Sequence, residues 1–272
     1  MVDLMRRNNV KVIGEGERTL MFGHGFGCDQ NMWRYIIPSF EKDYQIVLYD
    51  YVGSGNSDHT AYSSDKYHTL HGYKQDVLDI IEALNLNNII FVGHSVSAMI
   101  GMLASIERPF VFERLIMIGP SPRYVNDQGY VGGFEPGDVA ELLDMMEMNF
   151  AGWASFMAPL AMNNPERPVL TKELERSFIS ADPDIAREFA EATFLCDHRA
   201  DLNKVAVPVL IMQCSEDSVV PMEVGEYLHK HLKNSTLRLM SAKGHYPHIS
   251  HPEETVMLIR KYLNANAERI MY

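Results

Sequence analysis

The chain has 272 residues, 46% of them hydrophobic, and a formal net charge of −12. This length allows one substantial core and one inserted subdomain. The excess of acidic residues disfavours nucleic acid or an anionic membrane as a partner, because binding to phosphates requires clustered Lys and Arg.

Short apolar runs and scattered cysteines favour a cytoplasmic protein. The longest apolar runs, such as Ile89–Val92, have the length of a strand, and residues 1–7 lack the apolar core of an export signal. Cys28, Cys196 and Cys214 are odd in number and form no Cys-x-x-Cys pair. We therefore expect reduced thiols and neither a disulfide framework nor a zinc site.

The predicted elements alternate between strands and helices. Apolar, β-branched runs bounded by turn residues predict strands at 10–13, 19–22, 45–49, 89–92, 114–118, 208–214 and 236–240. Helical spacing of apolar residues predicts helices at 67–84, 95–107 and 253–264. This alternation predicts an α/β fold, with a mostly parallel twisted sheet covered by helices on both faces.

The alternation stops between residues 121 and 199. Four successive helical stretches are predicted there, at 136–148, 152–162, 171–180 and 183–195. We interpret this block as a helical cap (lid) over a core formed by residues 1–120 and 200–272. Aromatic and methionine side chains of the cap are expected to line an apolar substrate pocket, although each of them could simply pack the cap helices together. The expected pocket residues are Phe26, Phe134, Trp153, Phe156, Met157, Phe194 and Val219.

The most informative motif is a serine between a strand and a helix. Ser95 lies in Gly93-His94-Ser95-Val96-Ser97, directly after an apolar run and before a helix of small residues. This arrangement is typical of a nucleophile elbow, which lifts a serine hydroxyl out of the sheet. Ser97 replaces the last glycine of the usual Gly-x-Ser-x-Gly pattern and is still small enough for close packing of the helix.

An acid and a histidine follow the serine in the chain order that this motif requires. Asp217 comes after one predicted strand, and His245 follows Gly244 beyond the next. We expect Ser95, Asp217 and His245 to form a catalytic triad. His245 takes the proton of Ser95, and Asp217 orients His245.

Neighbouring side chains offer alternatives to this assignment. Glu216 immediately precedes Asp217, but is expected to point away from the site. His248 and His251 near His245 suggest a metal site, but prolines interrupt this segment and no carboxylate or cysteine completes a ligand set. We therefore expect no metal and no cofactor, and interpret His248 as a structural polar residue.

Two backbone amides are candidates for an oxyanion hole. The amide of Val96 lies at a helix N-terminus, where the helix dipole favours negative charge. The amide of Phe26 lies in the glycine-rich segment 23–27, where glycines allow the backbone to approach a substrate. The alternative for this segment is a plain glycine-rich turn.

Together these motifs resemble the α/β-hydrolase superfamily over nearly the whole chain. The closer similarity is to RsbQ, a bacterial energy-stress regulator, and to its plant relatives, the strigolactone and karrikin receptors. The stretches that carry it are His24–Gln30, Tyr49–Gly55, Gly93–Ile100, Met102–Ile106, Gly132–Glu135 and Gly244–His248. The resemblance implies an α/β-hydrolase fold with a four-helix lid inserted after the sixth strand, and an enclosed pocket. Phe26, Trp153 and Phe194 stand at pocket positions of the family, whereas Met157 stands at one that is often aromatic.

The expected function is that of a serine hydrolase of a small hydrophobic ester or lactone. The resemblance adds a signalling role of the RsbQ type in a stress response, with a signalling phosphatase of the RsbP type as candidate partner. The alternative is a ligand-sensing receptor of the strigolactone-karrikin type, whose output is protein binding rather than turnover. A haloperoxidase-like or dehalogenating enzyme shares the fold, but dehalogenases normally carry Asp where this chain has Ser95.

Overall fold

A seven-stranded sheet forms the centre of the computed structural model, which describes residues 3–267. Its strands are β1 (Lys11–Ile13), β2 (Arg18–Gly23), β3 (Tyr44–Leu48), β4 (Ile89–His94), β5 (Phe112–Ile118), β6 (Val209–Glu216) and β7 (Ser235–Lys243). They lie in the order β1-β3-β2-β4-β5-β6-β7. β1 pairs antiparallel with β3 and every other pair is parallel. The carboxyl ends of β4, β6 and β7 therefore lie along one edge of the sheet.

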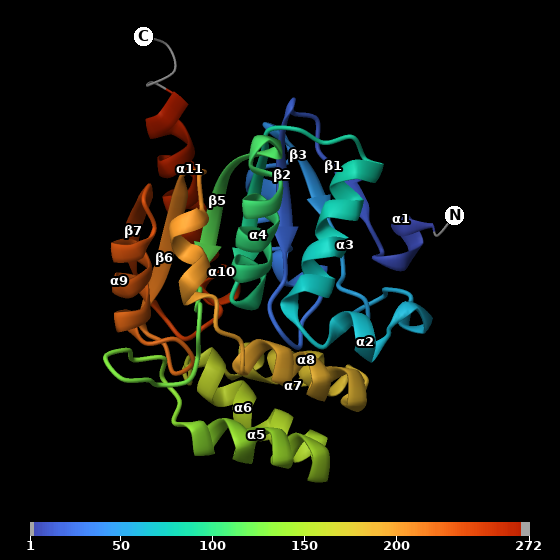
Figure 1. Cartoon of the computed structure of the whole chain (residues 1–272), viewed down its shortest axis with the longest axis vertical. Helices are drawn as coiled ribbons and strands as arrows, with labels where there is room; N and C mark the ends of the chain where they lie inside the picture. The colour runs from blue at the N-terminus through green and yellow to red at the C-terminus, as the bar shows by residue number, and fades with distance from the viewer. Residues whose placement is uncertain (1–2, 268–272) are drawn as a thin grey trace.

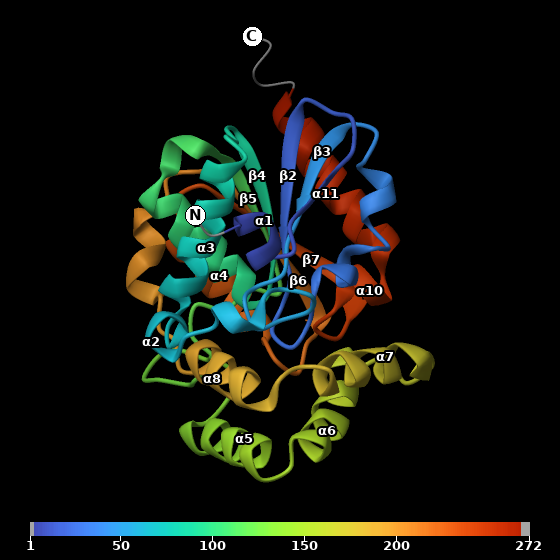
Figure 2. The same cartoon turned by 90° about the vertical axis from the view of Figure 1, so that its right-hand side faces the viewer.

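Alternate residues of the strands divide the core into two hydrophobic clusters, because successive side chains of a strand point to opposite faces. Ile89 and Phe91 of β4 belong to the cluster on one face, and Ile90 and Val92 to the cluster on the other. Both faces are apolar because both are covered by helices. Figure 2 shows α3, α4 and α9 on one side of the sheet, with α10 and α11 on the other.

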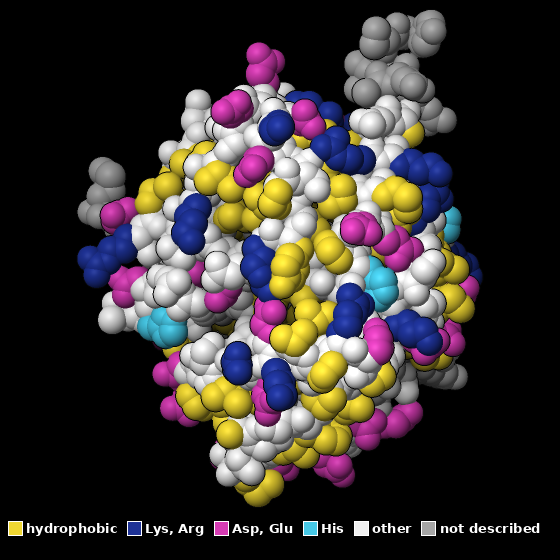
Figure 3. All heavy atoms as spheres, turned by 180° about the vertical axis from the view of Figure 1, so that it is seen from behind, with side chains coloured by type: hydrophobic (Ala, Val, Ile, Leu, Met, Phe, Trp, Pro, Cys, Tyr) yellow, Lys and Arg dark blue, Asp and Glu magenta, His cyan; other side chains and the backbone are white. Residues whose placement is uncertain are grey.

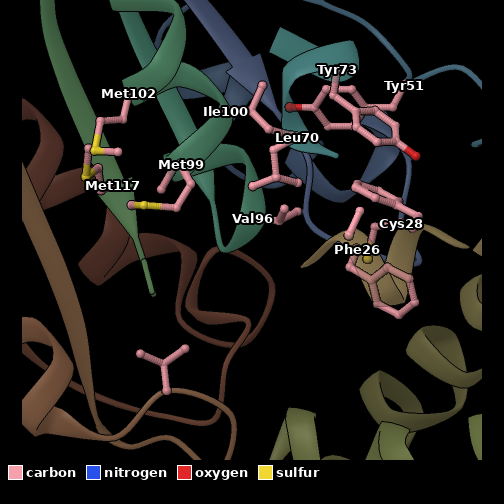
Figure 4. Close-up of a cluster of buried hydrophobic side chains, with 14 of the residues drawn as sticks. Phe26, Cys28, Tyr51, Leu70, Tyr73, Val96, Met99, Ile100, Met102 and Met117 are labelled. Atoms are coloured by element: carbon pink, nitrogen blue, oxygen red, sulfur yellow. The ribbon is translucent and has the colours of Figure 1, made fainter. Parts of the chain in front are cut away.

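The helices of the core connect these strands. They are α1 (Leu4–Arg7), α2 (Ser64–Tyr67), α3 (Leu70–Ala83), α4 (Val96–Glu107), α9 (Met222–His231), α10 (Pro247–Ser250) and α11 (Pro252–Ala267). The helix α4 is buried along nearly all of its length, because its small and apolar residues pack on the centre of the sheet. Figure 4 shows Met99 and Met102 of α4 directed toward Met117 of β5.

Four further helices form a layer beyond the carboxyl ends of the strands (Figures 1 and 2). They are α5 (Pro136–Met148), α6 (Phe150–Met162), α7 (Pro168–Ile179) and α8 (Pro183–Phe194), and we call them the cap. Pro at the start of α5, α7 and α8 has the fixed φ that suits the first turn of a helix. The cap lies over the edge of the sheet where the sequence places Ser95, Asp217 and His245.

The α/β-hydrolase fold predicted from the sequence is confirmed, with one correction. The cap follows β5, the fifth strand of the chain, and not the sixth. Only five segments before residue 121 are paired in the sheet, so the insertion comes one strand earlier. The assignment of residues 121–199 to a cap and of 1–120 and 200–272 to a core stays a prediction.

The surface carries mixed side chains. On the face seen in Figure 3, hydrophobic side chains lie between basic and acidic ones, and acidic side chains are frequent toward the cap. Among residues 3–267, no helix is both long and apolar enough to cross a membrane.

Candidate active site

Ser95 occupies the sharp turn between β4 and α4. Its φ of +55° and ψ of −122° are unusual for a residue with a side chain, and such strain persists only where the surroundings fix it. The amide of Ser95 donates to the carbonyl of Ile118 at 2.8 Å, which anchors the turn to β5. Gly93 allows the turn to be tight, because a Cβ there would lie 2.7 Å from the amide nitrogen of Ala98. The local sequence thus holds the Ser95 hydroxyl beyond the end of the sheet.

The structure brings Ser95, His245 and Asp217 together in one hydrogen-bonded series. His245 Nε2 lies 2.8 Å from Ser95 Oγ, and His245 Nδ1 lies 2.7 Å from Asp217 Oδ2. The other carboxylate oxygen of Asp217 accepts from the amides of Val219 and Val220 at 2.8 and 3.0 Å. These partners fix the tautomer, since Nδ1–H donates to the carboxylate and Nε2 accepts from the serine.

Glu216 does not compete for this position. Its carboxylate lies 2.6 Å from Lys243 Nζ, and both side chains are about half exposed. Adjacent residues at the end of β6 thus point in different directions, which leaves Asp217 as the acid that contacts His245.

Backbone contacts from the cap and from the elbow hold His245. The His245 amide donates to the carbonyl of Ala161 in α6 at 2.7 Å. Its carbonyl accepts from His94 Nε2 at 2.7 Å. Burial keeps the pKa of His94 well below its usual value, so His94 is a neutral donor. Gly244 has a φ of +79°, and a Cβ there would lie 2.0 Å from the carbonyl oxygen of Met162, so a side chain would force α6 away.

The segment 23–27 lies beside the elbow, and Ser97 binds it. The Ser97 hydroxyl donates to the carbonyl of His24 and accepts from Tyr51 Oη at 2.6 Å. His24 Nδ1 donates to the carbonyl of Gly25 at 2.9 Å. Within this turn, the amide of Cys28 donates a hydrogen bond to the carbonyl of Gly25. The amide of Phe26 takes no part in that hydrogen bond.

Tyr124 is a further polar group at the site. Its phenol oxygen lies 3.3 Å from Ser95 Oγ. Since the serine proton points to His245, the phenol donates to the serine oxygen. Burial raises the pKa of Tyr124 well above its usual value, so that the phenol stays protonated.

Two hollows adjoin one another above Ser95. The inner cavity has a volume of about 30 Å³, and its lining includes Ser95, His245, Phe26, Tyr124, Phe178, Thr193 and Phe194. The outer groove has a volume of about 360 Å³ and lies between α5, α6 and the loop after Asp217. Trp153, Met157 and Val219 line both of them. These three side chains therefore separate the serine from the larger hollow.

The predicted pocket residues divide between these hollows. Phe26 and Phe194 line the inner cavity, and Trp153, Met157 and Val219 line both. Phe134 and Phe156 do not reach the inner cavity and line only the outer groove. Phe156 precedes Met157 by one residue, which turns it about 100° around the helix, and it is 54% exposed. Phe134 lies before the start of α5, with its ring 5.8 Å from the ring of Phe194.

The histidines next to the site are packed rather than arranged as ligands. His248 is buried, with its ring 4.5 Å from both the Trp33 and the His94 rings. In the part of the chain that the structure describes, no group of three His, Cys, Asp or Glu side chains could hold a metal ion.

Sequence reasoning missed several residues of the site. Ser97 was interpreted only as a small residue, although its hydroxyl carries a hydrogen bond. Tyr124, Thr193 and Phe178 lie in the loop after β5 or on the cap, where the sequence shows no motif. The signal available for Tyr124 was its position just beyond the carboxyl end of a strand, the edge where sites of parallel sheets form.

Comparisons with known proteins agree with this geometry. The model of the alpha/beta hydrolase family matches residues 20–258. Among curated proteins, a karrikin insensitive 2 receptor of Petunia hybrida is 39% identical over 258 residues, 94% of this chain and 96% of that protein. A strigolactone esterase of Arabidopsis thaliana is 39% identical over 262 residues, 96% and 98% of the two chains. Among solved structures, a hydrolase from Oleispira antarctica superposes with a TM-score of 0.94 at 41% identity, covering 96% of each chain.

The chain therefore belongs to the alpha/beta hydrolase family, and within it to the group that contains the strigolactone esterases and karrikin receptors of plants. The family expected from the sequence motifs is confirmed. By its family and its relatives, the protein is a hydrolase.

Proposed function

We propose that the protein is a serine hydrolase of small hydrophobic esters or lactones, acting in the cytoplasm. The observation that carries this proposal is the hydrogen-bonded series Ser95–His245–Asp217, with distances of 2.8 and 2.7 Å, on a strained elbow beneath an apolar cavity. The name of the Arabidopsis thaliana relative, a strigolactone esterase, favours the ester class. Three free cysteines among the described residues fit a reducing compartment.

In the first half of the reaction, Ser95 Oγ attacks the carbonyl carbon while its proton passes to His245 Nε2. The carbonyl becomes an oxyanion, for which the amides of Val96 and Phe26 are the proposed donors. Asp217 stabilises the imidazolium without taking the proton. The carbon–oxygen bond to the leaving group then breaks, and His245 gives its proton to the departing oxygen. The product of this step is an acyl ester on Ser95.

In the second half, a water molecule from solvent replaces the alcohol. His245 takes a proton from the water, the hydroxide attacks the acyl carbon, and the bond to Ser95 Oγ breaks. The proton on His245 returns to the serine oxygen. A lactone follows the same steps, with the alcohol and the acid remaining parts of one molecule.

Covalent labelling and ester hydrolysis test this proposal. A fluorophosphonate probe should label the wild-type protein at Ser95, and Ser95→Ala should lose both labelling and hydrolysis of 4-nitrophenyl acetate. Asp217→Asn should lower kcat by about 10⁴-fold, because the imidazole loses its orienting acceptor. Glu216→Gln is the matched control and should keep the wild-type rate. Wild-type protein that is neither labelled at Ser95 nor able to hydrolyse short aryl esters would overturn the proposal.

A second candidate function is ligand perception with protein binding as the output. Relatives about 40% identical are named as karrikin receptors, which favours this role. In this second candidate function, the binding partner is the one that the resemblance to RsbQ suggests, a sensor phosphatase of a stress response. The measurement is binding of a purified phosphatase of that type to the wild-type protein, with and without an ester ligand. Binding that depends on the ligand and persists in Ser95→Ala supports this role, and no binding in either condition contradicts it.

A further inference from the structure

The corner between α6 and α7 contains a buried asparagine whose side-chain amide is fully paired. Asn164 is only 3% exposed. Its Nδ2 donates to the carbonyls of Met162 and Lys243 at 2.6 and 3.1 Å, and its Oδ1 accepts from Arg167 Nη2 at 2.8 Å. A carboxylate of the same shape has no hydrogen to donate, and an apolar side chain would leave both carbonyls without this donor. An amide side chain therefore matches this set of partners.

The side chains of Asn164 and Arg167 both reach the segment that carries His245. Asn164 binds the carbonyl of Lys243, which precedes His245 by two residues. Arg167 donates from Nη1 to the carbonyl of Ser250, which follows His245 by five residues. The two side chains also bind each other, so together they hold the chain on both sides of His245.

Between these two points, the backbone of the same corner packs directly on the segment. The amide of His245 donates to the carbonyl of Ala161 at 2.7 Å. Gly244 packs so closely on the carbonyl oxygen of Met162 that no side chain fits there. The Met162 carbonyl is also one of the two that Asn164 binds, so Asn164 fixes the atom against which Gly244 packs. The position of the corner therefore determines the position of the backbone that carries the imidazole.

From this arrangement we infer that Asn164 and Arg167 are positioning residues for His245 in catalysis. This inference rests on the proposed hydrolase function and assigns two further residues to it. Neither residue lines the inner cavity or the outer groove, so neither contacts a substrate held there. They act through the backbone on both sides of the imidazole. This action matters because a displacement of about 1 Å at the reacting atoms can lower the rate by about 100-fold.

Steady-state kinetics and labelling test the role of Asn164. Asn164→Ala should lower kcat for 4-nitrophenyl acetate by about 10- to 100-fold and leave KM within about twofold, because His245 moves a proton in both halves of the reaction. The rate of labelling by a fluorophosphonate probe should fall as well, since this reaction also requires His245 to take the proton of Ser95. Asn164→Asp keeps the shape and the acceptor for Arg167 but loses both donors. Its kcat should fall at least as far.

Arg167→Ala tests the inference even if the loss of Asn164 prevents folding, because the side chain of Arg167 is 40% exposed. We expect a smaller loss of kcat, about threefold, since water competes for the hydrogen bonds of a partly exposed group. In the double variant, the loss should be smaller than the product of the two single losses. Two residues that form one hydrogen-bonded unit do not act independently.

Asn8→Ala is the matched control for stability. Asn8 is fully buried, donates from Nδ2 to the carbonyl of Asp50 at 2.9 Å and accepts from Arg7 Nε at 2.7 Å. It therefore has the same kinds of partners as Asn164, but they lie in the N-terminal segment and after β3. Both alanine variants should lower Tm by about 2–4 °C. Only Asn164→Ala should lower kcat.

The outcomes separate this inference from the proposed function. A wild-type protein that is neither labelled at Ser95 nor able to hydrolyse the ester removes the proposed function, and the inference with it. An active wild-type protein, together with equal kcat values for Asn164→Ala and Asn8→Ala, overturns the inference alone. A higher KM at unchanged kcat also overturns it, because the residue would then act on binding. If the Asn164 variants do not fold, an unchanged kcat in Arg167→Ala has the same meaning.

Discussion

The phenol of Tyr124 and the hydroxyl of Ser95 lie 3.3 Å apart, so the proposed nucleophile contacts a second hydroxyl besides the imidazole. The phenol comes from the loop that leads from β5 to the cap, and the serine from the elbow of the core. The Ser95 oxygen is thus held between the core and the segment that leads to the cap.

Tyr124→Phe should lower kcat/KM for 4-nitrophenyl acetate by up to about tenfold, because one neutral hydrogen bond next to the reacting oxygen is lost. Steady-state kinetics check this value. Tyr130→Phe is the control, since its hydroxyl donates to the carbonyl of Arg123 away from the serine. An unchanged rate in Tyr124→Phe would show that this bond has no part in the reaction.

Ser97→Ala should lower kcat by about tenfold while KM changes little. The Ser97 hydroxyl binds the carbonyl of His24 and thereby holds the segment that carries the Phe26 amide, and an oxyanion donor acts mainly on the transition state. Ser105→Ala is the matched control, because that buried hydroxyl donates to the carbonyl of Met102 within α4. Equal kcat values for the two variants would contradict the role of Ser97.

Met157→Ala should shift the substrate preference toward longer acyl chains. Met157 lines both hollows, so truncating it joins the cavity at Ser95 to the outer groove. We expect the kcat/KM ratio of 4-nitrophenyl hexanoate to acetate to rise by about tenfold, and the free energy of unfolding to fall by about 2–5 kcal/mol. Met148→Ala, at a residue that is 81% exposed, should change neither quantity. A constant ratio in Met157→Ala would show that another residue limits the cavity.

The free energy of unfolding should fall as the pH is lowered below about 6.5. Burial, together with the charges of His245 and Arg34, lowers the pKa of His248 to about 3. The unfolded chain, with an ordinary histidine pKa of about 6.5, then binds more protons than the folded chain between these two values. Each such histidine contributes up to about 1.4 kcal/mol per pH unit. His24 and His94 act in the same direction, because burial lowers their pKa values as well.

Urea unfolding at pH 6 and pH 5 measures this effect. His248→Phe, which keeps a ring beside Trp33, should reduce the difference between the two pH values by up to about 1.4 kcal/mol. His231→Gln removes an exposed histidine and should leave the difference unchanged. A difference in His248→Phe equal to that of the wild type would mean that His248 is not the titrating group.

Periodicity predicted the seven strands and the cap helices because these elements have strong local signals. The apolar run Ile89–Val92 and the small residues after Ser95 define β4 and the start of α4 without any knowledge of their neighbours. The helix α9 was not predicted, although its buried residues Val224 and Leu228 are four residues apart, which is the spacing of one helix face. In the turn after β3, the carboxylate of Asp50 accepts hydrogen bonds from the amides of Gln30 and Asn56, so this turn supports the structure.

The site was harder to predict where its residues come from segments without a motif. Ser95, Asp217 and His245 each follow a predicted strand, so a parallel sheet places them along one edge. Thr193 and Phe178 lie on cap helices, and the packing of the cap on the core determines which face of each helix is directed toward Ser95. Phe156 and Phe134 were assigned to the pocket because they are aromatic residues of the predicted cap, and the packing places them only in the outer groove.

The bond from the His245 amide to the Ala161 carbonyl makes α6 a support of the proposed general base. A shift at the C-terminal end of this helix would displace the imidazole from the serine. Trp153 and Met157, which line both hollows, lie on the same helix about two turns and one turn before Ala161. Because one helix both lines the hollows and supports the imidazole, a movement of α6 as a whole would change the shape of the pocket and the position of His245 together.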